Sequence, residues 1–292
     1  MPNRPAHRAD WTLRNRWIAL GALCMMVLTP AAFAEPAHPG PQTAAIPPAW
    51  LRNAAPAPDP GNRPMIAVVI DDMGLDRARS GQVMRLPGPL TTSFMTFADD
   101  LPAQTAAARH DGHELLVHVP METADHLGHL VGPQALTTGA SDAELRERLD
   151  WDLSRFDGFV GINNHMGSKF TTDAHGMTRV METLRGRGLL FLDSRTAPKS
   201  AGMTAAAVLG VAHAGRDVFL DDPPTAENVS ARLAELEAVA RKRGSAIAIG
   251  HPRDPTIAGL AAWLPSLTGK GFALVPLSAV VRYRIATGKT EQ

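Results

Sequence analysis

The sequence predicts an α/β fold in which a parallel sheet is covered by helices. Two observations predict it. From residue 65 onward, short apolar runs alternate with amphipathic stretches of helical period. The runs are apolar along their whole length, which is typical of parallel strands buried on both faces. A sheet of this kind is either open or closed into a barrel, and the pattern alone leaves both possible.

Nine apolar runs are predicted to be strands. In chain order they are Met65–Ile70, Leu90–Phe97, Glu114–Val119, Phe159–Ile162, Gly188–Leu192, Ala207–Ala212, Val218–Leu220, Ser245–Ile249 and Phe272–Val275.

Three of the stretches between these runs carry clear helix signals. Residues 141–144 read Ser-Asp-Ala-Glu, which is a capping box, and leucines follow on one face. Residues 225–243 place apolar side chains on one stripe, and Gly244 after them suits a helix end. Residues 172–187 show the same spacing, so a helix is expected in each stretch.

The first 34 residues are predicted to be a secretory signal peptide. Arg8, Arg14 and Arg16 precede an apolar run over residues 17–28, and Ala-Phe-Ala follows at residues 32–34. These are the basic, apolar and cleavage regions of a signal, so we expect an exported protein, periplasmic or secreted, that meets the membrane only transiently. An uncleaved N-terminal anchor is the alternative, because the apolar stretch is near the lower length limit of a membrane-spanning helix.

The rest of the chain divides into a linker, one domain and a tail. Residues 35–63 are rich in Pro and Ala and show no apolar period, so a semi-extended linker is expected there. Trp50 within it either packs back on the domain or binds another molecule. The folded domain is expected over residues 64–284, and a C-terminal tail over residues 285–292.

The composition excludes several classes of function. The chain has 29 basic and 29 acidic residues, so no bulk electrostatic binding of nucleic acid is expected. Its single cysteine, Cys24, lies in the predicted signal peptide, so the mature chain has neither a disulfide nor a thiolate ligand. No glycine-rich phosphate loop follows the first strand, which argues against a nucleotide cofactor.

Polar side chains follow several of the predicted strands at their carboxyl ends. In parallel α/β folds, strand ends and loops build the active site at this edge. The residues concerned are Asp71, Asp72, His118, Asn163, Asn164, His165, Asp193 and His251.

These side-chain types suit metal-assisted hydrolysis of an amide or an ester. Two imidazoles and a carboxylate are a usual ligand set for zinc or a similar divalent ion, with a position left for water. A second carboxylate beside the first is placed to act as a base, and a further histidine to protonate the leaving group.

Several segments resemble motifs of the NodB-type polysaccharide deacetylases, a superfamily of carbohydrate esterases. The resemblance extends over about residues 65–282 and, in part, favours the divergent branch of the superfamily. It implies a distorted (β/α)7-type barrel with parallel strands, a divalent metal, with Zn²⁺ as the expected ion, and a polysaccharide substrate. The segments are Val-Ile-Asp-Asp-Met-Gly at 69–74, Gly-His-Glu-Leu-Leu-Val-His-Val-Pro-Met-Glu at 112–122, Ile-Asn-Asn-His-Met-Gly-Ser at 162–168, Phe-Leu-Asp-Ser at 191–194 and Ile-Ala-Ile-Gly-His-Pro at 247–252.

The resemblance also implies roles for individual residues. Asp71 is expected to act as the base and His251 as the general acid. Asp72 and His118 are expected to bind the metal.

The chain departs from the main branch of the superfamily in two places. Glu122 stands where a second metal-binding histidine is usual, and Asn163-Asn164-His165 replaces an Arg-x-Pro-Tyr motif. His165 is therefore expected to be the third ligand, with Glu122 as the alternative, and Asn164 is expected to stabilise the oxyanion.

Two further carboxylates have alternative interpretations. Asp193 is interpreted either as a residue that orients a neighbouring histidine or arginine, or as a structural residue that caps a turn or pairs with Arg195. Asp221 either faces the pocket or begins the following helix. Six further histidines are expected on the surface or in loops: His110, His113, His126, His129, His175 and His213.

Two functions are compatible with this sequence. The first is a metal-dependent hydrolase that removes acetyl or other acyl groups from an envelope or extracellular polysaccharide. The second is a deacetylase-like barrel that has lost catalysis and binds a glycan or an envelope protein. The Asp-Asp pair, His118 and His251 favour the first, and the departures at Glu122 and residues 163–165 favour the second.

Overall fold

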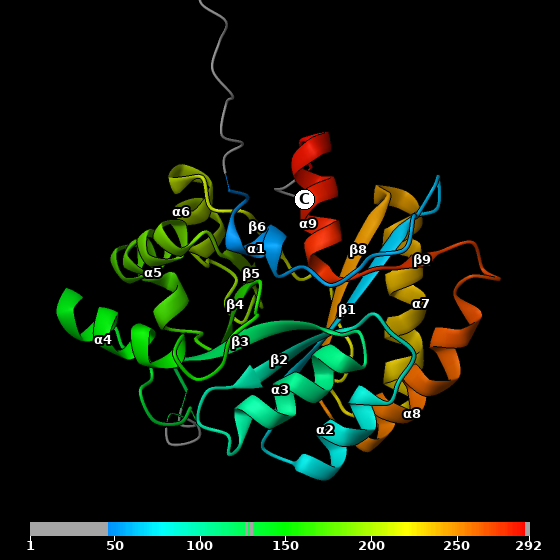
Figure 1. Ribbon diagram of the computed structural model, residues 1–292, viewed down its shortest axis with the longest axis horizontal. Coiled ribbons are helices and arrows are strands. Elements are labelled where there is room, and N and C mark those ends of the chain that lie inside the picture. The colour runs from blue at the N-terminus through cyan, green and yellow to red at the C-terminus, as the bar shows by residue number, and fades with distance from the viewer. Residues whose placement is uncertain (1–45, 126–127, 129–130, 290–292) are drawn as a thin grey trace, which may run out of the picture. The chain divides into compact units, whose positions relative to one another are not determined.

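The predicted parallel sheet is the centre of the fold. The structure, a computed structural model, describes residues 46–125, 128 and 131–289. Within them the strands form one sheet in the order β6-β5-β4-β3-β2-β1-β8-β7, and β9 pairs with β1. Every pairing is parallel. β6 and β7 end this order, so the sheet is a curled half-barrel, and the predicted parallel-strand class is confirmed (Figure 1).

The elements have the following bounds. The strands are β1 Met65–Met73, β2 Thr91–Met95, β3 Glu114–Met121, β4 Gly161–Met166, β5 Leu190–Asp193, β6 His213–Gly215, β7 Val218–Phe219, β8 Ser245–Gly250 and β9 Ala273–Leu274. The α-helices are α1 Ala49–Arg52, α2 Arg77–Met84, α3 Leu101–His110, α4 Asp142–Asp152, α5 Ala174–Arg187, α6 Gly202–Leu209, α7 Ala226–Arg243, α8 Asp254–Trp263 and α9 Leu277–Thr287.

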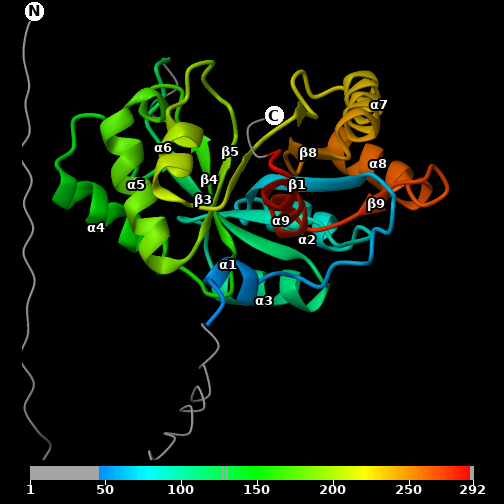
Figure 2. The ribbon, with the colours of Figure 1, turned by 90° about the horizontal axis from the view of Figure 1, so that it is seen from above.

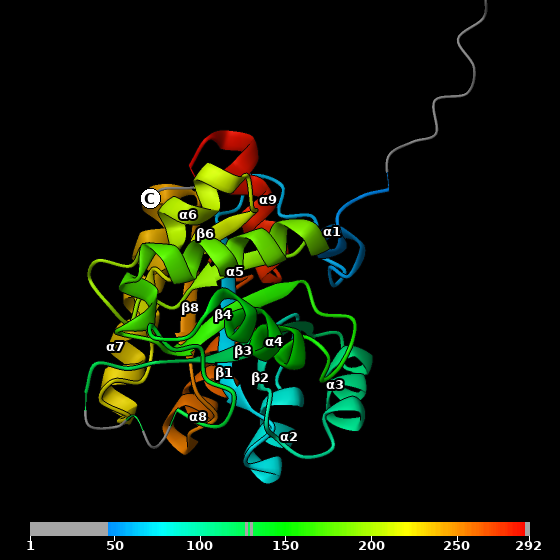
Figure 3. The ribbon, with the colours of Figure 1, turned by 90° about the vertical axis from the view of Figure 1, so that its left-hand side faces the viewer.

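Helices surround the sheet in an arc. Figure 1 shows α4, α5 and α6 on one side of the strands, α2 and α3 below them, and α7 and α8 on the other side. α5 contacts both α4 and α6, and the three lie side by side in Figure 3. α7 and α8 contact each other at the far side of the sheet (Figure 2). Within the described residues, no helix is both long and apolar enough to cross a bilayer.

The two faces of the sheet bury different apolar clusters. Along β1, Ile66, Val68 and Ile70 belong to the cluster that includes the side chains of the surrounding helices. The alternate residues Ala67 and Val69 belong to a second cluster, which contains the apolar side chains of α9. Because strand side chains alternate between faces, every second residue of β1 faces away from the arc of helices. α9 therefore covers the concave face of the curled sheet.

α9 covers only the part of the concave face near the amino ends of the strands. The backbone N–H of Leu277 donates to Oγ1 of Thr91 at 3.0 Å, and that of Ser278 to Oε1 of Glu114 at 2.9 Å. Thr91 and Glu114 are the first residues of β2 and β3. Burial raises the pKa of Glu114, and the free N–H groups at the start of a helix stabilise such a carboxylate. The carboxyl ends of the strands are left for the site.

The helix signals in the sequence correspond to helices in the structure. Ser141 and Glu144 form the predicted capping box at the start of α4. Thr225 accepts a bond from the backbone of Asn228 at the start of α7, and Gly244 ends that helix with a left-handed backbone. The helix predicted over residues 172–187 is α5.

One predicted strand is wrong. Residues 207–212 were expected to form a strand, but residues up to Leu209 belong to α6, and Gly210 ends this helix at φ 67°. Alanine has the highest helix propensity, and a short apolar run does not distinguish a buried strand from a helix by period. The strand of this segment, β6, begins only at His213.

Part of the predicted linker is folded onto the domain. Residues 49–52 form α1, and Trp50 is only 8 % exposed within the concave cluster. The side chain of Asn53 donates to the carbonyl of Phe159 at 2.8 Å, and the backbone N–H of Ala55 donates to Glu114 at 3.3 Å. Of the two alternatives for Trp50, the structure shows packing on the domain. Residues 1–45, with the predicted signal peptide at 1–34, lie outside the described residues.

Two histidines expected on the surface are buried instead. Nδ1 of His113 accepts the backbone N–H of Leu90 at 3.1 Å, and its Nε2 lies 2.8 Å from the carbonyl of Met84. His213 is 6 % exposed, and its Nδ1 lies 2.7 Å from the carbonyl of Val211. The ring of His113 joins two backbone segments, whereas the contact of His213 stays within its own segment.

Candidate metal and catalytic site

The site lies at the carboxyl ends of β1, β3, β4 and β8. In the β3–β4 register His118 is opposite Asn163, and Pro120 is opposite His165. Side chains two apart on a strand share a face, so Asn163 and His165 both face the side on which His118 lies. Asp71 follows the residue of β1 that pairs with Gly250, and His251 follows Gly250. The parallel register thus brings these side chains to one edge.

An irregularity in β1 turns two consecutive carboxylates toward the same side. The β1–β2 register shifts between Ile70 and Met73, and Asp72 has φ 54°, in the left-handed region. In a regular strand Asp71 and Asp72 would point to opposite faces. An irregularity of this type bends the strand and re-aims one side chain. The cost of the left-handed backbone is typical of functional sites.

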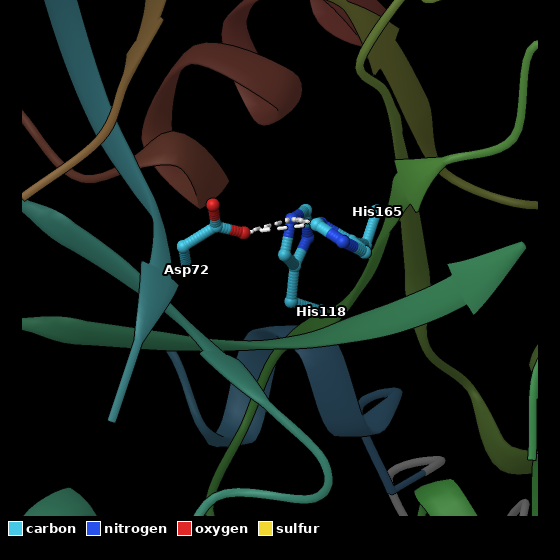
Figure 4. A group of neighbouring side chains, drawn as sticks. All are labelled: Asp72, His118 and His165. Carbon is cyan, nitrogen blue, oxygen red and sulfur yellow. Dashed lines mark hydrogen bonds and ion pairs between the residues drawn. The ribbon is translucent and has the colours of Figure 1, made fainter. Parts of the chain in front are cut away.

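Three side chains converge on one point. Oδ1 of Asp72 lies 3.0 Å from Nδ1 of His165 and 3.4 Å from Nε2 of His118. The two imidazole nitrogens are 3.3 Å apart. Figure 4 shows these side chains pointing toward one another from three strands, and their ligand atoms all lie within 4.8 Å of each other. The structure therefore brings together the three residues expected from the sequence as ligands.

The three side chains are suited to hold a divalent cation. Nδ1 of His118 lies 2.8 Å from Oδ1 of Asn163, an acceptor, so the proton is assigned to Nδ1 and Nε2 presents its lone pair to the site. Oδ1 of Asp72 is buried and has no hydrogen-bond partner of good geometry among the described residues. Burial opposes ionisation of Asp72, but the adjacent imidazoles of His118 and His165 outweigh it and hold the pKa of Asp72 well below its usual range. Two imidazole nitrogens and one carboxylate oxygen match the ligand set of a catalytic zinc.

Asn163 connects the metal-binding side of the site to Asp71. Its Nδ2 donates to Oδ1 of Asp71 at 2.8 Å and to Oγ of Ser194 at 3.2 Å. Its Oδ1 accepts from Oγ of Ser93 at 2.5 Å, besides the contact with His118. The amide of Asn163 is completely buried and fixes both neighbouring side chains.

Asp71 has the surroundings of a base. Its side chain is buried, and burial raises the pKa of Asp71 although the charges of His118 and His251 lower it. Its Oδ2 lies 3.7 Å from Nε2 of His118. A carboxylate with a raised pKa takes a proton more readily near neutral pH than an ordinary aspartate.

His251 and Asp221 form a hydrogen-bonded pair. Nδ1 of His251 lies 2.9 Å from Oδ1 of Asp221, and the backbone N–H of His251 donates to Oδ2 at 2.7 Å. Oγ1 of Thr256 also donates to Oδ2 of Asp221, at 2.8 Å. Burial lowers the pKa of His251, but the hydrogen bond that His251 donates to Asp221 and the charges of Asp72 and Asp221 outweigh it, so the pKa of His251 is raised. Nε2 of His251 is left to face Asp72 Oδ2, 3.9 Å away.

Asn164 does not have the free amide that an oxyanion donor needs. Its Nδ2 donates to the carbonyl of Met166 at 2.7 Å and to Oγ1 of Thr196 at 3.2 Å. Its Oδ1 accepts the backbone N–H of Ser194 at 2.9 Å. Asn164 therefore holds the loops after β4 and β5 together, and of the two asparagines it is Asn163 that contacts Asp71. The structure gives no support to the expected oxyanion role of Asn164.

Glu122 is not brought to the cluster. Its Oε2 accepts the backbone N–H and the hydroxyl of Thr138, at 2.8 and 2.9 Å. Its Oε1 pairs with Nζ of Lys169 at 2.6 Å. With both oxygens committed to these partners, Glu122 is placed as a structural residue rather than as the alternative ligand.

Asp193 lies buried at the end of β5. Its Oδ1 accepts the backbone N–H of Arg195 at 2.8 Å, so it caps the turn that follows the strand. This is one of the roles left open by the sequence. Its Oδ2 has no hydrogen-bond partner among the described residues.

A cavity of about 340 Å³ opens beside these groups. Its volume is in the range of small-molecule binding pockets. Arg216 and Arg195 line it, and neither is among the site residues predicted from the sequence. The residues that line it are Asp71, His118, Asn164, Met166, Ser194, Arg195, Thr196, Arg216, Phe219, Asp222, Ile249 and His251.

The region of this chain that is similar to known proteins includes the whole site. A family model described as divergent polysaccharide deacetylase matches residues 68–281, which include every site residue from Asp71 to His251. An uncharacterized protein of Haemophilus influenzae is 35% identical over 202 residues, which are 69% of this chain and 71% of that protein. The uncharacterized protein YibQ of Escherichia coli is 33% identical over 192 residues, which are 66% of this chain and 60% of that protein, less than two thirds of its length. The crystal structure of uncharacterized protein ATU2773 from Agrobacterium tumefaciens C58 has a TM-score of 0.77 and 28% identity, covering 80% of this chain and 95% of that one.

Proposed function

Because the chain belongs to the divergent polysaccharide deacetylase family, we propose that it is a metal-dependent hydrolase that removes an acetyl or similar acyl group from a polysaccharide. One observation carries the proposal. Asp72, His118 and His165 converge beside a buried Asp71 and a His251 that is held by a carboxylate. A barrel that only bound a glycan would have no need of both a cation site and two groups placed for proton transfer.

Each of these side chains has a defined task in the reaction. Asp72, His118 and His165 hold the divalent ion, zinc in our proposal, which when bound supplies a Lewis acid for the acyl carbonyl and lowers the pKa of water. Asp71 takes a proton from the attacking water at its free carboxylate oxygen, because its Oδ1 is held by Asn163.

His251 delivers the second proton. Asp221 holds Nδ1 of His251 and leaves Nε2 directed to the site, where it protonates the departing nitrogen or oxygen. The raised pKa of His251 keeps the ring protonated closer to neutral pH, as a general acid requires.

The substrate and location are part of the same proposal. The predicted signal peptide supports export, so the polysaccharide belongs to the cell envelope or the extracellular space. The cavity beside Asp71 and His251 has room for a small part of such a chain.

Metal analysis of purified variants tests the proposal. We expect near-stoichiometric zinc in the wild type, and loss of zinc in Asp72→Asn and His118→Ala. Asp71→Asn should keep the metal but lose hydrolysis of acetylated glycans, because Asp71 is not among the converging ligands. The matched control is Asp99→Asn, an exposed carboxylate in the loop before α3, which should retain both metal and activity.

The same measurements separate the two candidate functions. A wild-type protein without metal, even after zinc is supplied, would contradict the hydrolase and support a barrel that binds without catalysis. Metal retained at full occupancy in Asp72→Asn would contradict the ligand assignment.

A further inference from the structure

Two arginines without carboxylate partners stand together on one wall of the cavity. Arg195 follows β5 and Arg216 follows β6, and both line the cavity with Asp71 and His251. None of the ion pairs between described residues includes either arginine. The two guanidinium groups are close enough to repel each other, since Arg195 contributes to lowering the pKa of Arg216, after the larger effect of burial.

Arg216 is held rigidly in this position. Its Nε donates to the carbonyl of Ser194 at 2.8 Å, and one of its terminal nitrogens donates to the carbonyl of Arg195 at 3.2 Å. Its guanidinium carbon lies 4.6 Å from the ring centroid of Phe219. The other terminal nitrogen has no hydrogen-bond partner among the described residues, and a group fixed in this way loses little entropy when it binds an anion.

Arg195 reaches the same wall through an unfavourable backbone. Its φ is 52°, in the left-handed region that residues with long side chains seldom adopt. Its guanidinium lies directly on Gly215, where a Cβ would come within 2.5 Å of Nε. The absence of a side chain at Gly215 thus makes room for the guanidinium of Arg195 next to that of Arg216. Charge repulsion between the two guanidinium groups and the left-handed backbone of Arg195 both oppose this placement.

None of the carboxylates near Arg216 forms an ion pair with it among the described residues. Asp71 is bonded to Asn163, and Asp217 pairs with Arg243 at 3.0 Å and with Arg284 at 2.5 Å. One oxygen of Asp193 accepts the backbone N–H of Arg195 rather than its guanidinium. These charges help to keep Arg216 protonated, but none of them neutralises the pair by direct contact.

We propose that Arg195 and Arg216 form a subsite for an anionic substituent, a carboxylate or a phosphate, of the glycan whose acyl group is removed. Guanidinium groups bind both anions through paired N–H donors. The subsite rests on the proposed function for its position beside the reacting acyl group. It makes the substrate an acidic polysaccharide rather than a neutral one.

Binding of matched oligosaccharides tests the subsite without any need for catalysis. The probes are a tetramer of glucuronic acid, its methyl ester and a phosphorylated neutral tetramer, each titrated calorimetrically into the wild-type protein. We expect the acid or the phosphorylated tetramer to bind at least about tenfold more tightly than the ester, which is a small effect for two charged contacts. The preferred probe identifies the anion as a carboxylate or a phosphate.

Variants then assign the preference to the two arginines. Arg195→Gln and Arg216→Gln should each remove most of the preference for the anionic probe. Arg216→Lys should show a preference between that of Arg216→Gln and that of the wild type. Arg195 makes no side-chain hydrogen bond or ion pair to another described residue, so we expect its replacement to leave the fold intact. Arg232→Gln, an exposed arginine of α7, is the matched control and should keep the full preference.

The outcome also separates this subsite from the proposed hydrolysis. Equal binding of acid, phosphate and ester, including no binding of any, would overturn the subsite, as would a preference that survives both glutamine variants. Hydrolysis of acetylated neutral and acidic tetramers at equal rates would overturn the subsite alone. Arginine-dependent binding without hydrolysis would overturn the proposed function alone.

Discussion

Asp71 and Asp72 are adjacent in the chain, but their surroundings give them opposite tendencies to hold a proton. Burial raises the pKa of Asp71, whereas the two imidazoles outweigh burial at Asp72 and lower its pKa. A pair of carboxylates separated in this way is typical of a site in which one group exchanges protons and the other stays ionised. The difference depends on the left-handed backbone of Asp72, which turns its carboxylate to His118 and His165.

The role of Asp221 gives a prediction at this scale. Asp221→Asn should retain the metal but lower kcat on an acetylated amine by about 10²-fold or more, because His251 loses the carboxylate that orients and stabilises its protonated ring. The measurement is kcat with two substrates, an N-acetyl sugar and an activated aryl acetate. The aryl leaving group needs no proton, so its rate should fall much less. An equal fall with both substrates would contradict the role of His251 as proton donor.

Most of the site residues could be predicted from where strands end. Asp71, His118 and His251 stand directly at or after apolar runs, and a parallel sheet brings such positions together. Asn163 could not be separated from Asn164, because the strand was predicted to end at residue 162, whereas β4 continues to Met166. With the true bounds, the alternation of a strand places Asn163 on the face of His165.

At the scale of elements, the close approach of β4 and β5 fixes the position of the third ligand. A Cβ on Gly161 would lie 2.1 Å from the carbonyl oxygen of Leu190, so only glycine allows this pairing. Gly161 begins the strand that carries Asn163 and His165. This glycine could not be recognised from the sequence, because its contact is with a residue 29 positions away, the difference between positions 190 and 161.

Substitution of this glycine should separate the two strands. Gly161→Ala is expected to lower the free energy of unfolding by about 3 kcal/mol or more, as overpacking against rigid backbone does. It should also weaken metal binding, since His165 moves with β4. Gly186→Ala in α5 is the matched control: nothing lies within 4 Å of its Cβ, so it should be neutral or stabilising. Thermal unfolding of the two variants and the wild type decides between these effects.

The carboxyl end of α4 provides a prediction about pH. Asp152 is completely buried, and burial raises the pKa of Asp152 to about 8. In the unfolded chain this group ionises near pH 4, at about the ordinary value for aspartate. The unfolded state therefore releases the proton first, so the contribution of Asp152 to stability is lost as pH rises from about 4 to 8.

Asp152→Asn should remove this part of the pH dependence. We expect the variant to be more stable than the wild type at pH 9, by about 1–3 kcal/mol, because a neutral amide replaces a buried charge. Near pH 4 the two proteins should differ little. Asp150→Asn, an exposed neighbour on α4 that pairs with Arg187, is the control and should leave the slope unchanged. Parallel stability curves for wild type and Asp152→Asn would contradict the burial argument.

At the scale of the whole molecule, the amino-terminal segment and α9 together close one end of the concave face. Trp50 belongs to the same apolar cluster as Val280 and Val281 of α9, and Ala55 and Ser278 both donate to Glu114. The Pro-rich composition of residues 35–63 predicted an extended chain, and it left packing of Trp50 on the domain as only one of two alternatives. Sequence reasoning therefore predicted the sheet and its class better than the edge of the domain.

Removal of this segment should destabilise the domain without altering the site. A chain that begins at residue 64 is expected to be less stable than one that begins at residue 46 by about 3–5 kcal/mol, the usual cost of losing a buried tryptophan. Denaturant unfolding of the two chains measures the difference. The variant Leu51→Ala in the longer chain is the control, because this side chain is 37% exposed. Equal stability of the two chains would show that the segment contributes no net packing energy.

The left-handed backbone at Asp72 also restricts which sequences can encode this site. Gly adopts that conformation most readily, and Asn and Asp do so more often than other side chains, but of these three only Asp offers a charged oxygen. Glutamate would carry the charge but would strain the backbone in the left-handed region. Asparagine would tolerate that backbone conformation but would carry no charge. We therefore expect a relative of this chain without Asp at position 72 either to lack this ligand or to hold it on a strained backbone.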